Sequence, residues 1–322
     1  MRTNTKGLGK LGWTLILLVW LAALLFGLWH WALNAQSVST LDRADAIFTS
    51  NSAKVSQPIL FGPEADQKLV VVTPSKPAER PLPVVIFIHG GSWAKGDPVD
   101  YAYIGRNFAP EGYVVVSAGY RLVPGGEFPA MLEDGAASVR WVVDNIAHYG
   151  GNPDRIYLMG HSAGAYNAVM LALDPQWLEQ EGLPGNTIDG AIGLAGPYDF
   201  LPLDSESTKN AFGAASNLDR TQPINFVGPN TPPILLLTGN ADETVRPRNS
   251  RALAAKISKS GAQNEPVEFD NMGHAGIIMA LSRPFAGDGA VKRAIIEWLA
   301  KQEATQDLEN GTPSGTIQPA QG

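Results

Sequence analysis

One short motif, Gly-His-Ser-Ala-Gly at residues 160–164, limits the folds open to this chain. It directly follows the apolar run at 155–159 and directly precedes a helix-compatible stretch at 165–173. A G-x-S-x-G turn between a strand and a helix forces its serine into a sharp corner, because the flanking glycines remove side chains that would collide with neighbouring backbone. Free N–H groups at the helix start can then stabilise an oxyanion. Ser162 is therefore a candidate nucleophile; the alternative is a helix N-cap serine in a glycine-rich loop.

Apolar runs and helix-compatible stretches alternate from residue 65 onward. We expect strands over residues 69–72, 84–88, 113–117, 156–159, 191–194 and 234–237, and helices over residues 131–145, 165–173, 250–260 and 289–301. Continuous apolar runs are typical of strands covered on both faces. Alternation of strands with helices predicts an α/β fold with a parallel sheet wrapped by helices.

The chain divides into four predicted parts. Residues 36–64 are a stalk, an N-terminal cap or a first helix packed on the domain. Residues 65–302 form the catalytic domain, and the polar residues 303–322 form a disordered tail. Residues 198–233 interrupt the alternation with no clear period. A loop of that length is usually functional, so we interpret it as a partial cap over the active site; the alternative is a solvated surface excursion.

The fourth part, residues 1–35, contains an almost unbroken apolar run from Leu11 to Leu33, preceded by Arg2, Lys6 and Lys10. About 20 apolar residues span a bilayer core. Basic residues ahead of such a run predict a cytoplasmic N-terminus and a catalytic domain on the periplasmic or extracellular side. We therefore expect one transmembrane anchor. The alternative is a cleaved signal peptide, which would give a secreted protein.

Composition excludes several classes of function. The net charge of −7 argues against a nucleic-acid partner, which requires a basic face. Five unclustered histidines and no cysteine give no expectation of a metal site, and disulfides are impossible.

A serine nucleophile needs a histidine base, and elimination leaves one candidate. His30 lies in the apolar N-terminal run, His89 and His161 lie in glycine turns, and His148 precedes the nucleophile strand. His274 lies in a glycine-flanked loop near the C-terminus, as the chain order Ser, Asp, His requires.

The carboxylate that orients this base is predicted at Asp242. It lies in a loop that follows the strand at 234–237, at the sheet edge where catalytic groups gather in open α/β sheets. Glu243 is the second choice, and Asp270 is a weaker one because it precedes His274 in the same segment. Asp242 could instead cap the helix that follows Val245.

The oxyanion hole is predicted from two segments. The strand at 84–88 runs into His-Gly-Gly-Ser-Trp at 89–93, where Gly90 and Gly91 allow backbone N–H groups to point into a shared hollow. The N–H of Ala163, the residue after the nucleophile, supplies the other half.

These residues resemble the α/β-hydrolase superfamily, and within it the bacterial carboxylesterases similar to hormone-sensitive lipase and the arylformamidases. The resemblance covers residues 65–300 and is carried by motifs at 88–93, 120–122, 128–134, 150–155, 160–164, 238–245 and 273–274. It implies an eight-stranded, mostly parallel sheet, a Ser162, Asp242 and His274 triad, an oxyanion hole at Gly90, Gly91 and Ala163, and no cofactor. Ser92 replaces the third glycine of the lipase-like pattern, which brings this loop closer to the arylformamidase form.

We therefore expect a serine hydrolase that cleaves small-molecule esters with short or medium acyl groups through an acyl-enzyme. An arylformamidase would use the same residues on an N-formyl amide. A non-catalytic binding module on this fold is the alternative from another class.

Overall fold

A mixed sheet forms the centre of the computed structural model, which describes residues 10–34, 38–49 and 51–309. Nine strands are found in this part of the chain, in the order β1-β3-β5-β4-β6-β7-β8-β9, with β2 also paired to β3. Their bounds are β1 (Ala53–Val55), β2 (Ile59–Leu60), β3 (Lys68–Pro74), β4 (Leu82–Ile88), β5 (Val114–Ala118), β6 (Gly151–His161), β7 (Gly190–Leu194), β8 (Ile234–Gly239) and β9 (Val267–Phe269). β3 runs antiparallel to its neighbours, and the pairings from β5 through to β9 are parallel.

The mostly parallel sheet agrees with the sequence-based prediction, but the expected number of eight strands is one too few. β1 and β2 pair with the two ends of the same edge of β3. Pro58 lies between them, and proline has no N–H to donate to a ladder. The extra strand therefore comes from an edge strand that is broken in two.

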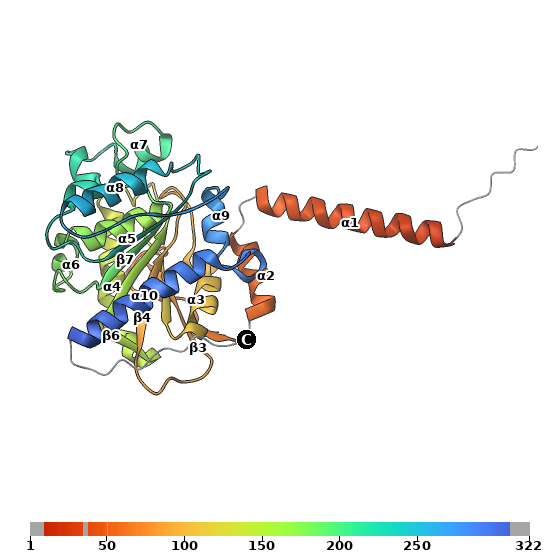
Figure 1. Ribbon diagram of the computed structural model, residues 1–322, viewed down its shortest axis with the longest axis horizontal. Coiled ribbons are helices and arrows are strands. Elements are labelled where there is room, and N and C mark those ends of the chain that lie inside the picture. The colour runs from red at the N-terminus through yellow and green to blue at the C-terminus, as the bar shows by residue number, and fades with distance from the viewer. Residues whose placement is uncertain (1–9, 35–37, 50, 310–322) are drawn as a thin grey trace, which may run out of the picture.

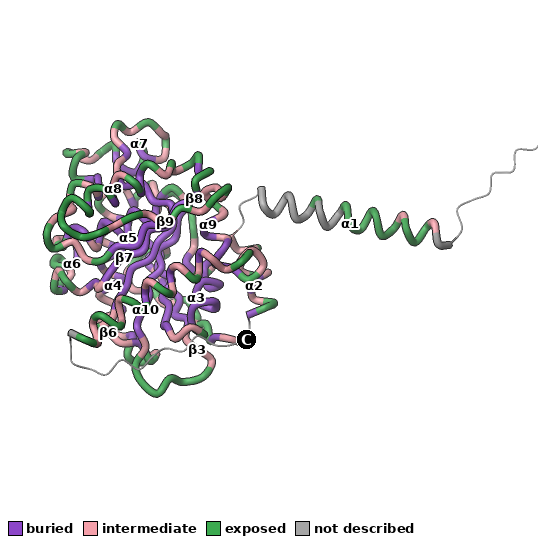
Figure 2. Tube along the Cα trace, in the orientation of Figure 1, coloured by how far each residue is buried: buried purple, intermediate pink, exposed green. Residues whose placement is uncertain are grey.

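Helices cover both faces of the sheet (Figure 1). Their bounds are α1 (Lys10–Asn34), α2 (Val38–Thr49), α3 (Ala102–Phe108), α4 (Ala130–Asn145), α5 (Ala163–Leu173), α6 (Gln176–Gln180), α7 (Glu206–Phe212), α8 (Arg248–Lys259), α9 (His274–Met279) and α10 (Ala290–Glu309). Successive side chains of a strand point to opposite faces. Accordingly, Val84 and Ile86 of β4 pack with α4, α5 and α8, whereas Val85 and Phe87 pack with α3, α9 and α10. Figure 2 shows the buried strands between the two helical layers.

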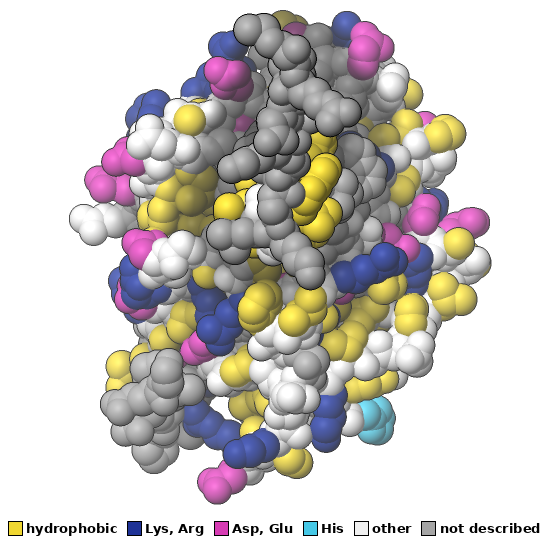
Figure 3. Space-filling model, turned by 90° about the vertical axis from the view of Figure 1, so that its right-hand side faces the viewer, with side chains coloured by type: hydrophobic (Ala, Val, Ile, Leu, Met, Phe, Trp, Pro, Cys, Tyr) yellow, Lys and Arg dark blue, Asp and Glu magenta, His cyan; other side chains and the backbone are white. Residues whose placement is uncertain are grey.

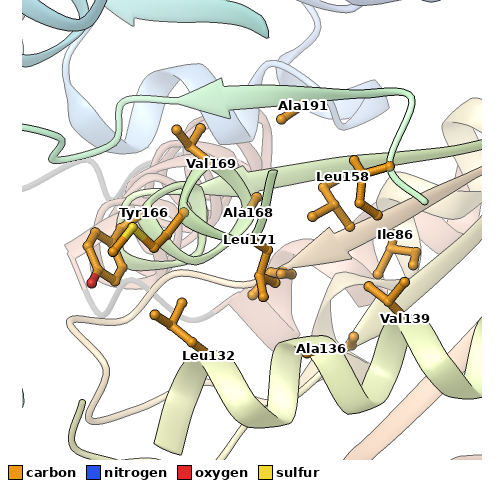
Figure 4. Close-up of a cluster of buried hydrophobic side chains, with 14 of the residues drawn as sticks. Ile86, Leu132, Ala136, Val139, Leu158, Tyr166, Ala168, Val169, Leu171 and Ala191 are labelled. Carbon is orange, nitrogen blue, oxygen red and sulfur yellow. The ribbon is translucent and has the colours of Figure 1, made fainter. Parts of the chain in front are cut away.

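The α4 face of the core explains why the amphipathic pattern at 131–145 predicted a helix. Leu132, Ala136 and Val139 recur at helical spacing on one side of α4 and are fully buried. They face Ile86 and Leu158 of the sheet and the side chains of α5 (Figure 4).

In the segment at 36–64, for which a stalk, a cap or a first helix packed on the domain was expected, residues 38–49 form a helix that packs on the domain. Asp45 of α2 is 0% exposed and accepts hydrogen bonds from the Asn107 side chain (2.9 Å) and from the Arg283 backbone N–H (2.7 Å). Asp42 pairs with Arg106 of α3 at 2.7 Å. Buried carboxylates require such partners, and these fix α2 against the body.

The predicted tail begins too early. α10 continues to Glu309, because Glu303 and Asp307 pair with Arg155 at 3.2 and 2.8 Å and Glu303 accepts a hydrogen bond from the Tyr157 hydroxyl at 2.7 Å. These partners lie about 150 positions away in sequence, so the local polar composition gave no sign of them. The rest of the predicted tail, residues 310–322, lies outside the described residues.

The segment at 198–233 contains α7 and two short 3-10 turns, Leu218–Thr221 and Pro223–Phe226. Its first residues are fastened to the body because the Asn249 side chain accepts hydrogen bonds from the N–H groups of Tyr198 and Asp199, at 3.0 and 3.1 Å. α7 lies at the same end of the molecule as α8 and α9 (Figure 1).

α1 lies apart from the sheet and its covering helices (Figure 1), and the described side chains at 12–23 are mostly exposed. In the part of the chain that the structure describes, no helix combines the length and the apolarity needed to cross a membrane. Residues 1–9 and 35 of the predicted N-terminal part lie outside the described residues.

Candidate active site

Ser162 stands at the corner between β6 and α5. Its backbone has φ 54° and ψ −120°, a conformation that is rare for a residue with a side chain and that signals strain. A Cβ at Gly160 would lie 2.1 Å from the carbonyl oxygen of Gly164, and a Cβ at Gly164 would lie 2.1 Å from that of Ile88. Both glycines of the motif are therefore required by close backbone contacts, as the sequence pattern predicts.

The structure brings the three predicted triad side chains into contact. Ser162 Oγ lies 2.9 Å from Nε2 of His274, and Nδ1 of the same ring lies 2.7 Å from Oδ2 of Asp242. The other carboxylate oxygen of Asp242 accepts hydrogen bonds from the N–H groups of Thr244 and Val245, each at 2.9 Å. Asp242 therefore orients the imidazole and also shapes its own turn. It does not cap the helix that follows, because α8 has Pro247 at its N-cap and no side-chain capping bond.

A polar latch joins the loop of Asp242 to the loop of His274. The Asn240 side chain donates to Asp270 Oδ1 at 2.7 Å and accepts from the N–H of Asn271 at 2.8 Å. The N–H of Ala241 donates to the carbonyl of Met272 at 3.1 Å. Asp270, a weaker candidate for the orienting carboxylate, thus belongs to the latch.

Gly90, Gly91 and Ala163 converge beside the nucleophile, since the register pairs Ile88 at the end of β4 with Gly160 in β6. A Cβ at Gly90 would lie 3.1 Å from that of Ser162. In the described part of the protein, the N–H groups of Gly91 and Ala163 have no backbone acceptor outside their own helix or strand. Such unpaired donors can bind a developing oxyanion.

His89, set aside as a base by elimination, orients the Gly90–Gly91 peptide. Its ring is stacked between Tyr101 and Tyr120, and burial lowers its pKa, so it is neutral. Nδ1 donates to the carbonyl oxygen of Gly90 at 2.8 Å. Because the C=O and N–H of one trans peptide point in opposite directions, this bond turns the N–H of Gly91 away from His89.

An aromatic cluster packs behind the oxyanion loop. Trp93 donates to the Asn167 side chain at 3.2 Å and contacts the rings of Tyr166 and Phe212, with centroids 5.5 and 4.8 Å away. Phe200 joins the same buried cluster. These aromatic residues fill the core, and Phe226 packs half-buried against it. Phe212 belongs to the 198–233 segment and links it to the site.

Sequence reasoning missed His89, His161 and Asn240 as parts of the site. His161 is buried, and its Nε2 lies 3.1 Å from the carbonyl oxygen of His274. Their position within glycine motifs next to the proposed catalytic residues was the available signal. No group of three or more His, Asp or Glu side chains able to hold a metal ion is found among residues 10–34, 38–49 and 51–309.

The fold and the site define the class of protein: an α/β-hydrolase fold with a Ser-His-Asp constellation at the carboxyl edge of its sheet. Solved structures share this fold. Esterase B from Lactobacillus rhamnosis superimposes with a TM-score of 0.73 at 21% identity, covering 90% of this chain and 100% of that one. The BD-FAE family matches residues 69–257, more than half of the sequence, and the chain belongs to this family.

Curated relatives extend the comparison. Esterase LipQ of Mycobacterium tuberculosis (strain ATCC 25618 / H37Rv) is 30% identical over 252 residues, covering 70% of this chain and 58% of LipQ. Kynurenine formamidase of Danio rerio is 32% identical over 158 residues, covering 48% of this chain and 51% of that protein. The chain thus spans just over half the length of the curated relatives it matches.

Proposed function

We propose that this protein is a serine carboxylic ester hydrolase that acts on short or medium acyl esters. The observation that carries the proposal is the continuous path from Ser162 Oγ through His274 to Asp242, with contacts of 2.9 and 2.7 Å. Membership of the BD-FAE family and the likeness to LipQ support the same reaction class.

The geometry suggests a two-step mechanism. Nε2 of His274 takes the proton of Ser162 as the hydroxyl attacks the ester carbonyl, and Asp242 stabilises the imidazolium that forms. The N–H groups of Gly91 and Ala163 bind the oxyanion, a contribution of about 2.7 to 4 kcal/mol per donor. The imidazolium then protonates the leaving alcohol. Water activated by His274 releases the acid from the acyl-enzyme.

The experiment is hydrolysis of p-nitrophenyl acetate, butyrate and octanoate by the wild type, Ser162→Ala and Ser258→Ala. Ser258 is an exposed serine on α8 and serves as the matched control. We expect turnover of the shorter esters by the wild type and the control, and none above background by Ser162→Ala. Equal turnover by Ser162→Ala would contradict the mechanism, and an inactive wild type would favour a non-catalytic module.

N-formyl aromatic amides are a second candidate substrate class. Ser92 in the oxyanion loop and the likeness to kynurenine formamidase support it. Comparison of kcat/KM for N-formylkynurenine and p-nitrophenyl acetate decides between the two classes. A higher value for the formamide would replace the esterase assignment and leave the triad unchanged.

We further propose that residues 1–35 attach the protein to a membrane, with the catalytic domain on the periplasmic or extracellular side. The support is the apolar run and its basic flank, together with exposed side chains of α1 such as Trp13, Leu17 and Trp20, which are 59, 67 and 71% exposed. On the face toward which α1 extends, basic and acidic side chains lie among apolar ones (Figure 3).

Cell fractionation with and without residues 1–35 tests the attachment. We expect the full chain in the membrane fraction and the shortened chain outside it. A full-length chain recovered in the soluble fraction would contradict the proposal. A mature protein whose mass lacks the N-terminal segment would instead favour signal cleavage and secretion.

A further inference from the structure

His161 is the last residue of β6 and immediately precedes Ser162, yet its side chain contacts a different part of the site. The residue is buried, with 7% of its surface exposed. Nε2 lies 3.1 Å from the backbone carbonyl oxygen of His274, and the centroids of the two imidazoles are 4.8 Å apart at an interplanar angle of 38°. A side chain on the nucleophile strand thus holds the backbone of the proposed base.

The same imidazole also borders the oxyanion loop. A Cβ at Gly90 would lie 3.1 Å from Nδ1 of His161 and 2.8 Å from its carbonyl oxygen. The ring is therefore enclosed between Gly90 and His274. One side chain consequently touches the segments that carry the proposed nucleophile, base and oxyanion hole.

The protonation state of His161 follows from its surroundings. Burial, followed by the charge of the neighbouring His274, lowers its pKa from 6.5 to about 3, while the hydrogen bond to the His274 backbone and the charge of Asp242 act in the opposite direction. The ring is therefore neutral near pH 7. A carbonyl oxygen only accepts hydrogen bonds, so Nε2 carries the proton of the neutral ring and donates it to His274. A neutral donor also adds no positive charge beside His274 when that ring becomes an imidazolium.

We propose that His161 is a positioning residue for the general base. Its Nε2–H fixes the first peptide of α9, and this keeps the His274 ring within proton-transfer distance of Ser162 Oγ. The inference rests on the proposed function only through the identity of the base, because the contacts themselves are independent of the substrate.

The test uses three variants of His161. The amide nitrogen of His161→Gln reaches the position of Nε2 and restores a neutral donor. His161→Leu has similar bulk but no hydrogen-bond donor. His161→Asn has a donor, but its side chain is too short to reach the carbonyl oxygen of His274. His148→Gln is the matched control, because His148 is exposed and lies before β6. The readouts are kcat and KM for p-nitrophenyl acetate, the rate of Ser162 phosphonylation by a fluorophosphonate, and the thermal midpoint.

We expect His161→Leu and His161→Asn to lose about 10- to 100-fold in kcat and in phosphonylation rate with little change in KM, because displacement of a catalytic group by 1 Å can cost about 100-fold. His161→Gln should stay within about threefold of the wild type. A merely structural role would lower the thermal midpoint and the amount of active protein, but not the rate for each titrated site.

Two outcomes would overturn the inference: wild-type phosphonylation rates in folded His161→Leu, or equal losses in the Gln and Asn variants. The Gln and Asn pair decides if His161→Leu does not fold. Phosphonylation of the wild type without turnover of any ester would contradict only the proposed function. The phosphonylation rates of the variants would still test the role of His161.

Discussion

Replacement of Asp242 by asparagine should abolish catalysis without unfolding the protein. Oδ1 of Asp242 accepts two backbone hydrogen bonds at 2.9 Å, from Thr244 and Val245. An asparagine must place its oxygen there, because its NH2 group would face two N–H donors in the opposite orientation. The NH2 group is thereby directed at Nδ1 of His274, where the carboxylate accepted at 2.7 Å.

The magnitude follows from the tautomer that this substitution imposes. With Nδ1 accepting from the amide, a neutral His274 carries its proton on Nε2 and can no longer accept the proton of Ser162. In a triad, this tautomer error lowers kcat by about 10⁴, or about 5.5 kcal/mol of transition-state free energy. Because the asparagine still accepts both backbone bonds, the free energy of unfolding should change by less than about 1 kcal/mol.

The assay is steady-state hydrolysis of p-nitrophenyl acetate together with urea unfolding. Glu243→Gln is the control, since Glu243 is the exposed neighbour that was the second choice for this role. It should stay within about twofold of the wild type. A folded Asp242→Asn that loses tenfold or less would refute the assignment of Asp242, and a large loss in Glu243→Gln would transfer the role to that residue.

Three further predictions test the framework around the site. Gly164→Ala should lose activity and about 1–3 kcal/mol of stability, since its Cβ would lie 2.1 Å from the carbonyl oxygen of Ile88; an active, equally stable variant in thermal unfolding would contradict the close packing of the corner. Removal of residues 303–322 should cost about 2 kcal/mol in urea unfolding because Arg155 and Tyr157 lose Glu303; an unchanged free energy of unfolding would count against the α10 contacts. His161, with its pKa lowered from 6.5 to about 3, binds a proton more readily in the unfolded chain. The free energy of unfolding should therefore decrease as the pH is lowered from 6.5 to about 3. Its share of the slope is at most about 1.4 kcal/mol per pH unit, and His161→Gln should show a shallower acid slope; an unchanged slope would show that this histidine is not buried and neutral.

The sequence could predict those parts of the fold that depend on the residue pattern within a single segment. The run at 84–88 and the amphipathic helix at 131–145 each bury a continuous apolar surface, and the structure has β4 and α4 at these places. The requirement for glycine at both ends of the motif at 160–164 could be predicted as well. A Cβ at either position would collide with backbone that lies a few residues away or in the adjacent strand.

The remaining features depend on partners far along the chain. The last turns of α10 depend on Arg155, and the split edge strand depends on how the chain at Pro58 returns to β3. In the site, His161 was dismissed because its position in the motif does not reveal that its ring contacts the backbone of His274, 113 residues later. Elimination among histidines can select a base, but it cannot detect a histidine that acts through another.

The polar contacts of α2 determine where a shortened enzyme can safely begin. A chain that starts at residue 38 keeps Asp42 and Asp45 and therefore all the acceptors that Arg106, Asn107 and the N–H of Arg283 use. A chain that starts at β1 would leave the Arg106 guanidinium, the Asn107 amide and the Arg283 backbone N–H without these acceptors. Arg283 lies shortly after α9, the helix that begins with His274. For protein engineers, the useful cut between the apolar N-terminal segment and the folded domain therefore falls ahead of this helix.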